Sequence, residues 1–185
     1  MAKKQEMVTL EEAREQVRKV CRRLGLLHLA YAKTIIDEVG EEKGTQLVLE
    51  AIKNYARIVG EEVKKKVKAQ GLENVPANYK EDLPLYGMHD RTETVEVNGE
   101  KRTRLYGCVM AQVWHGLGED ELGRLYCYVD PAKYMAFNPN FKQAHTKVVP
   151  EGCDYCELVI RPTTEQERKD LADKDKDWRY IDLVK

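Results

Sequence analysis

Apolar side chains recur at steps of three and four residues through the first 70 residues, and this period constrains the fold most. Thr9 and Glu12 have the spacing of a helix capping box, and Gly40 is a stop signal. A second apolar stripe runs over residues 43–70, where lysines suit the negative end of a helix. The pattern predicts two long amphipathic helices over residues 9–70.

The hydrophobic period changes to two after a loop at residues 71–84. Residues 92–97 alternate between polar and apolar side chains, and Asn98-Gly99 is a strong signal for a two-residue hairpin turn. The return strand is expected to lead into the largely apolar run 106–114. Such a run predicts a central strand, buried on at least one face.

A short helix is expected inside the sheet part, from Gly118 to Asp130, because acidic residues fill its first turn. Pro131 would begin a short turn capped by the Asp130 side chain. Two more strands, over residues 141–149 and 153–161, would then form a hairpin.

Helices that come first and strands that come later indicate an α+β fold. We expect two long N-terminal helices packed on a C-terminal antiparallel β-sheet, with a short inserted helix. The expectation is one domain over residues 1–185, with a helical part (9–70), a sheet part (85–162) and a charged tail (163–185). The tail would form a short helix and a surface strap. The apolar surface of the helix pair would also suit a homo-oligomer, such as a homodimer.

Composition and charge argue against several classes of partner. The net charge is −1 although 34% of the residues are charged, so no large basic surface indicates nucleic acid. No apolar run reaches the roughly 18 residues of a membrane span. The first residues lack the apolar region of a signal peptide, so we expect a cytoplasmic protein with its five cysteines kept as thiols.

Two of these cysteines are spaced Cx2C in the stretch EGCDYC, residues 151–156. In a regular strand Cys153 and Cys156 would point to opposite faces, with Cys156 on the more apolar one. A turn at Cys153 or a bulge would change this geometry. We therefore expect that the two thiols do not act as a pair. Two sulfurs within ligand distance of one centre would contradict this expectation.

A zinc or iron site would need more ligands than this pair supplies. The other candidate ligands are Cys108, Cys127, His115 and His145. The chain has no second Cx2C and no His-x3-His, and a redox dithiol lacks its usual strand–CxxC–helix setting. We expect no cofactor; a metal, if one binds, would be held by Cys127, Cys156 and His145.

A second cysteine setting lies in the segment Leu125–Pro131, where Cys127 is close to Asp130. Simple packing of the thiol and capping by the carboxylate would also explain these two residues. These two residues belong to a longer pattern: Gly118-x2-Glu121-Leu122-Gly123-x2-Tyr126-Cys127-x2-Asp130, then Phe137-Asn138-Pro139, then Gly152-x3-Cys156. This order and spacing resembles the L-2-amino-thiazoline-4-carboxylic acid hydrolase family. The likeness extends over residues 9–161, and Cys153 is additional to its pattern.

The resemblance implies hydrolysis of a C–N or C–S bond in a cyclic isothiourea or related amidine that carries a carboxylate. Cys127 is the first candidate nucleophile and Cys156 the second, since a thiolate attacks amidine carbons well when a neighbour takes its proton. Asp130 would orient the substrate nitrogens, and His145 would be the general acid or base. The candidates for substrate binding are His115, Tyr126, Asn138 and Arg161. Each histidine also fits a structural role, and Arg161 also fits a solvated strand end.

Other mechanisms and another class of function remain open. Water could attack directly with Asp130 or Glu157 as the base, or a metal-bound hydroxide could attack. A non-enzymatic sensory domain of the vinyl-reductase type, which binds a small molecule or a metal, is the alternative function, and an adaptor subunit is a third. A cavity where Cys127, Asp130 and His145 converge would favour the enzyme. An apolar pocket with thiols but no acid or base would favour the sensor.

Overall fold

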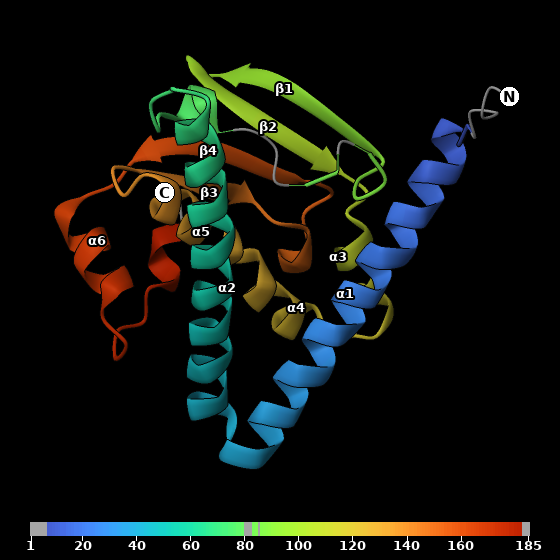
Figure 1. Cartoon of the computed structure of the whole chain (residues 1–185). Helices are drawn as coiled ribbons and strands as arrows, with labels where there is room; N and C mark the ends of the chain where they lie inside the picture. The colour runs from blue at the N-terminus through green and yellow to red at the C-terminus, as the bar shows by residue number, and fades with distance from the viewer. Residues whose placement is uncertain (1–6, 80–82, 85, 183–185) are drawn as a thin grey trace, which may run out of the picture.

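The computed structural model of the chain describes residues 7–79, 83–84 and 86–182. The expected first residue of the sheet part, residue 85, and the last three residues of the expected tail lie outside this range. Figure 1 shows two long helices that form a V, with the strands near its open end. The helices are α1 (Leu10–Val39) and α2 (Glu41–Ala69), and Gly40 joins them with a φ of 85°.

The expected start of α1 is confirmed. The Glu12 backbone N–H donates to the Thr9 hydroxyl, and the Thr9 backbone N–H donates to the Glu12 carboxylate, so both halves of the capping box are present. Cys21, Leu29 and Ala32 are buried along one face of α1. None of the helices in the described part of the chain is both long and apolar enough to cross a lipid bilayer.

Four strands form one antiparallel sheet in the order β1-β2-β4-β3. Their bounds are β1 (Arg91–Val97), β2 (Glu100–Tyr106), β3 (Phe141–Lys147) and β4 (Cys156–Pro162). The predicted hairpin turn is confirmed, because Asn98 and Gly99 have φ values of 53° and 78° between β1 and β2. The α+β expectation is therefore confirmed.

The apolar run at residues 106–114 does not continue the strand as expected. Gly107, with a φ of 65°, ends β2, and helix α3 (Val109–Gly116) follows. Gln112 within this run and His115 just after it are exposed, three residues apart, while most of the other residues of the run are buried. This spacing fits a helix with one buried face, and α3 packs that face against α1.

The expected helix up to Asp130 is divided in two. Helix α4 (Asp120–Cys127) ends before α5 (Val129–Phe137) begins. Asp130 lies inside the first turn of α5 and does not cap it, contrary to expectation, because its carboxylate pairs with Lys133 instead. Pro131 fits without strain because it lies in the first turn, where the backbone N–H has no helical partner.

Helix α5 connects the long helices to the sheet. It packs against α2 on one side and against β3 on the other. Gly60 of α2 permits the close approach, since an added Cβ there would collide with the Lys133 carbonyl oxygen and lie 2.8 Å from the Ala136 Cβ. The position of α5 is therefore set by backbone packing on α2.

The short helix expected in the charged tail is present, but the segment after it is anchored in the core and is not only a surface strap. The tail forms α6 (Glu165–Ala172) and a 3₁₀ turn, η3 (Arg179–Asp182), and two further 3₁₀ turns lie at Pro76–Asn78 (η1) and Val149–Glu151 (η2). Trp178 and Ile181 join the main hydrophobic core, and Ile181 is fully buried. The sequence pattern missed this because only a few apolar residues are set among many charges.

Candidate active site

A cavity of about 400 Å³ lies where the short helices meet the sheet, and we call it the sheet-side cavity. Its wall takes side chains from α2 to α5 and from all four strands. Six residues that the sequence singled out line it together: Cys108, Tyr126, Cys127, Asp130, His145 and Cys156. The enclosure is that of a ligand pocket, because cavities of roughly 300–1,000 Å³ hold small molecules in proteins.

Asp130 and Lys133 project from one face of α5 into this wall. Lys133 Nζ lies 3.0 Å from Asp130 Oδ1, and the two side chains are only 7% and 19% exposed. Burial raises the pKa of the Asp130 carboxyl, but the charges of Lys133 and then His145 outweigh burial and hold this pKa below its ordinary value. The cavity therefore has an ionised carboxylate beside it at neutral pH.

His145 lies on β3, next to a register shift in the pairing of β3 with β4. Its Nδ1 is 3.0 Å from both carboxylate oxygens of Asp182, and its backbone N–H donates to the same carboxylate at 3.0 Å. Because a carboxylate only accepts, we assign the ring proton to Nδ1. The other nitrogen, Nε2, faces the cavity and lies 3.6 Å from Asp130 Oδ2. Such an Asp–His pair is the arrangement that orients a general base.

Asp182 is held by several contacts in a fully buried position. Arg124 Nη2 donates to Asp182 Oδ2 at 2.6 Å, and Arg124 Nε donates to Glu151 at 2.6 Å. Lys142 Nζ donates to the carbonyl oxygen of Ile181 at 2.8 Å, which fixes η3 against β3. The imidazole of His145 is therefore oriented by a rigid partner.

Three thiols line the cavity: Cys108, Cys127 and Cys156. Burial raises the pKa of Cys127 well above its ordinary value, and the nearby Arg124 reverses only part of this effect. Burial also raises the pKa of Cys108, and it raises that of Cys156 to about 12 although the Val149 N–H donates to its sulfur. All three are therefore neutral thiols at pH 7.

Aromatic side chains make up much of the remaining wall. Tyr126 lies 6.3 Å from Tyr55 and 6.1 Å from Trp114, measured between ring centroids. Tyr79 stacks on Tyr134 at 4.1 Å. All five line the cavity, so its wall contains two aromatic groups in addition to the polar groups on α5 and β3.

Three of the expected binding residues lie elsewhere. The His115 side chain is 81% exposed and lies 3.0 Å from Asp120. The Asn138 amide donates to the Asn74 carbonyl oxygen, and the Arg161 guanidinium pairs with Glu100. None of these three side chains lines the sheet-side cavity, and each has a local structural partner.

Glu157, one of the two carboxylates considered as a base, also points away from the cavity. It accepts hydrogen bonds from Arg102, Arg104 and Thr146 in the sheet. Burial raises its pKa, but these three donors prevail and bring the pKa to about 2. A carboxylate so firmly held in its ionised form is a poor proton acceptor, so Glu157 has a structural role.

A comparison with known protein families found a match over most of the chain. A protein-family model described as L-2-amino-thiazoline-4-carboxylic acid hydrolase matches residues 11–160. The chain belongs to this family. Neither a search of curated proteins nor a search of solved structures found a significant match.

The match to the L-2-amino-thiazoline-4-carboxylic acid hydrolase family covers α1 through most of β4 but not η3. Cys127, Asp130, His145 and Cys156 lie within the matched residues, whereas Asp182 lies beyond them. The sequence reading missed Asp182 and Lys133. A signal for Asp182 existed, because Trp178 and Ile181 are large apolar residues in an otherwise charged tail, which indicates a buried segment.

The sequence also left open a metal centre held by Cys127, Cys156 and His145. Over the described residues, no three side chains of His, Cys, Asp or Glu come together in a group that could hold a metal ion. Cys127, Cys156 and His145 share the cavity but do not form such a group. Cys153 precedes β4 and does not line the cavity, whereas Cys156 is buried in it, so the two cysteines of the Cx2C lie in different places.

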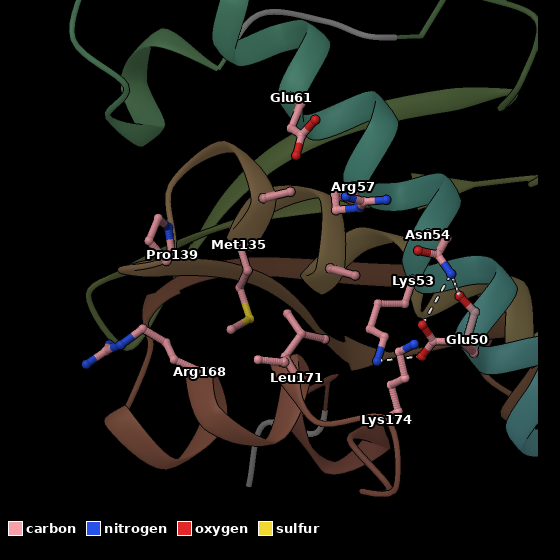
Figure 2. A pocket seen from close by; sticks show the side chains of 13 residues that line it. Glu50, Lys53, Asn54, Arg57, Glu61, Met135, Pro139, Arg168, Leu171 and Lys174 are labelled. Carbon is pink, nitrogen blue, oxygen red and sulfur yellow. Dashed lines mark hydrogen bonds and ion pairs between the residues drawn. The ribbon is translucent and has the colours of Figure 1, made fainter.

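A second cavity, of about 340 Å³, lies between α2, α5 and α6, and we call it the helix-side cavity. Figure 2 shows Met135 and Leu171 pointing toward each other at its floor, with charged side chains around the rim. Lys53 pairs with Glu50 one turn away on α2, at 2.6 Å, and Arg168 donates to Thr163 just before α6. Lys53 Nζ also donates to the Asp173 carbonyl oxygen at 3.3 Å, which links α2 to the segment after α6.

Proposed function

We propose that this protein is a hydrolase that opens a C–N or C–S bond of a cyclic isothiourea or a related amidine. Membership of the L-2-amino-thiazoline-4-carboxylic acid hydrolase family supports the reaction class. The observation that carries the proposal is the His145 imidazole, held between Asp182 and Asp130 in the wall of the sheet-side cavity.

His145 acts as the general base and then as the general acid. Its Nε2 takes a proton from water as the water oxygen bonds to the carbon between the ring sulfur and nitrogen. The same proton then passes from Nε2 to the sulfur or nitrogen that leaves as the ring bond breaks. Asp182 holds Nδ1–H and stabilises the imidazolium that forms between the two steps.

Asp130 and Lys133 bind the two ends of the substrate. An amidine group has N–H donors that match an ionised carboxylate, and the lowered pKa of Asp130 supplies that carboxylate at neutral pH. The Lys133 ammonium, 3.0 Å from it, is the cation placed to receive a substrate carboxylate. The substrate would then replace part of the Asp130–Lys133 pair with contacts of its own.

Water, not Cys127, is the nucleophile in this proposal. A thiol whose pKa burial has raised is rarely a thiolate at pH 7, and the thiolate is the reactive form. The cysteines then line the cavity as small, weakly polar side chains. The sequence alone favoured attack by a cysteine over direct attack by water, and the raised pKa of Cys127 reverses that order.

The test is to incubate the full chain with 2-amino-thiazoline-4-carboxylate and with larger cyclic isothioureas, and to follow addition of one water by mass spectrometry. His145→Gln should lower kcat/KM by about 10²- to 10⁴-fold, the usual contribution of a general base. His115→Gln, which changes an exposed histidine outside the cavity, is the matched control and should retain activity. Cys127→Ser should also retain activity; its complete loss would restore the covalent route. No water addition to any member of the set would refute the hydrolase.

A ligand-binding sensory domain is the second candidate, because aromatic rings and neutral thiols form much of the cavity wall. The same experiment separates it from the hydrolase. Tight binding of a cavity ligand, with no chemical change over a long incubation, would support the sensor. Convergence of Cys127, Asp130 and His145 on one cavity is the reason to place the enzyme first.

A further inference from the structure

The sheet-side cavity is large for 2-amino-thiazoline-4-carboxylic acid, the molecule in the family's name. That molecule is one five-membered ring with an amine and a carboxylate, so it is polar on most sides. The cavity encloses about 400 Å³, within the range of roughly 300–1,000 Å³ that takes drug-sized ligands. A single small ring placed against Asp130 would leave much of this space to water.

The charged groups are concentrated in one part of the wall. Asp130 and Lys133 lie on one face of α5, and His145 faces them from β3 with its Nε2 3.6 Å from Asp130. A small polar head group needs only these three side chains. His89, Thr103 and Gln143 are among the few other polar side chains of the wall.

That remaining wall is mostly aromatic and aliphatic. Tyr55, Trp114 and Tyr126 form one group, with ring centroids about 6 Å apart, and Leu158 and Met110 extend the apolar surface. Tyr55 is 40% exposed, which places it at the rim of the cavity. Aromatic side chains bind other rings by edge and offset contacts, whereas they contribute little binding free energy to a small charged molecule.

We propose that the substrate of this protein carries an aromatic or branched aliphatic group on the isothiourea or amidine ring. The polar ring lies against Asp130, Lys133 and His145, and the apolar group lies against the surface formed by Tyr55 and Tyr126. This inference rests on the proposed function for its ring chemistry, but the size and apolar character of the ligand come from the cavity alone.

The test compares two ligands with the same polar head, 2-amino-thiazoline-4-carboxylate and its 5-phenyl derivative, by titration calorimetry on the full chain. The phenyl derivative should bind at least about tenfold more tightly, since even one methylene in an apolar pocket changes recognition by roughly 10- to 200-fold. Equal or tighter binding of the unsubstituted acid would overturn the inference.

Two tyrosine variants locate the apolar group. Tyr55→Ala should weaken the phenyl derivative by about tenfold and leave the unsubstituted acid unchanged. Tyr31→Ala is the matched control, because Tyr31 is 65% exposed on α1 and does not line the cavity. Equal losses in the two variants, or no loss in Tyr55→Ala, would overturn the placement.

The binding result and the chemical result are separate. If the phenyl derivative binds tightly but neither compound gains water, the proposed hydrolysis fails and the inference about ligand size stands. If the unsubstituted acid binds better and is opened, the hydrolysis stands and the inference fails.

Discussion

The two cavities on either side of α5 differ in how their charged groups are held. In the sheet-side cavity, Asp130, His145 and Asp182 are largely buried and bond across α5, β3 and η3. In the helix-side cavity, Lys53 pairs with Glu50 on its own helix and donates to a main-chain carbonyl oxygen, that of Asp173, while Arg168 donates to nearby Thr163. Arg57 is exposed at the rim (Figure 2).

This difference in how charges are held distinguishes the sheet-side cavity, the candidate site, from the helix-side cavity, a hollow at the surface. Burying a charge is unfavourable unless partners are placed for it. Buried charges that meet across three elements beside a cavity therefore mark the sheet-side cavity as the candidate site. An exposed charge such as that of Arg57 is already solvated and needs no such placement. The volumes, about 400 and 340 Å³, do not distinguish the two cavities.

The largest expected effect is on stability when Asp182 is removed. Asp182→Ala leaves the buried Arg124 without its main partner and should lower the free energy of unfolding by about 3–5 kcal/mol, measured by urea denaturation. Asp177→Ala is the matched control in the same tail, because Asp177 is half-exposed and pairs with Arg179 two residues away; its loss should stay below about 1 kcal/mol. Equal losses would mean that Asp182 is no better held than a surface acid.

The next effect concerns the thiols of the sheet-side cavity. Burial and the raised pKa, about 12 at Cys156, should slow alkylation of Cys127 and Cys156 by iodoacetamide at pH 8 by about 100-fold or more relative to the urea-unfolded chain. Mass spectrometry of peptides gives each rate. Cys153, which lies outside the cavity wall, should differ much less between the two states. A native Cys127 that reacts faster than the unfolded one would support a thiolate nucleophile.

A smaller effect should appear in acid. Because the pKa of Asp130 is below its ordinary value of about 3.9, the native state holds the ionised carboxylate more strongly than the unfolded chain does. This stabilisation is present above about pH 4 and is lost as the pH falls through the lowered native pKa. Urea unfolding of wild type and Asp130→Asn at several pH values should therefore show a difference that shrinks below pH 4. A difference that stays constant would contradict the assignment.

The smallest effect is expected at the helix-side cavity. Arg57→Gln should change stability by no more than about 0.5 kcal/mol, since it alters an exposed rim residue. It should leave the rate of ring opening unchanged in the mass-spectrometric assay. A large loss of activity would show that the helix-side cavity takes part in function and would remove the contrast between the two cavities.

The sequence predicted the elements whose signals are local. The capping box at Thr9 and the Asn98-Gly99 turn depend on neighbours along the chain, and both are confirmed. The run at residues 106–114 was predicted wrongly because short apolar segments fit a strand or a helix equally, and packing against α1 decides between them.

The site was predictable only in part for the same reason. Asp130 and His145 were selected from their chemistry, and the structure places them on one cavity. Asp182 is 37 residues from His145 in sequence, and no local pattern links them. Arg161 has the right chemistry for a carboxylate, but Glu100 on a neighbouring strand already occupies it, which only the sheet order reveals.

Gly60 has a consequence for how this family evolves. Its missing side chain lets α2 touch the backbone of α5 at Lys133, so any larger residue would displace the turn that carries Asp130 and Lys133. We expect relatives with the same chemistry to keep glycine or to change α2 and α5 together. Selection acting on the cavity thus reaches a residue on a different helix that has no functional group of its own.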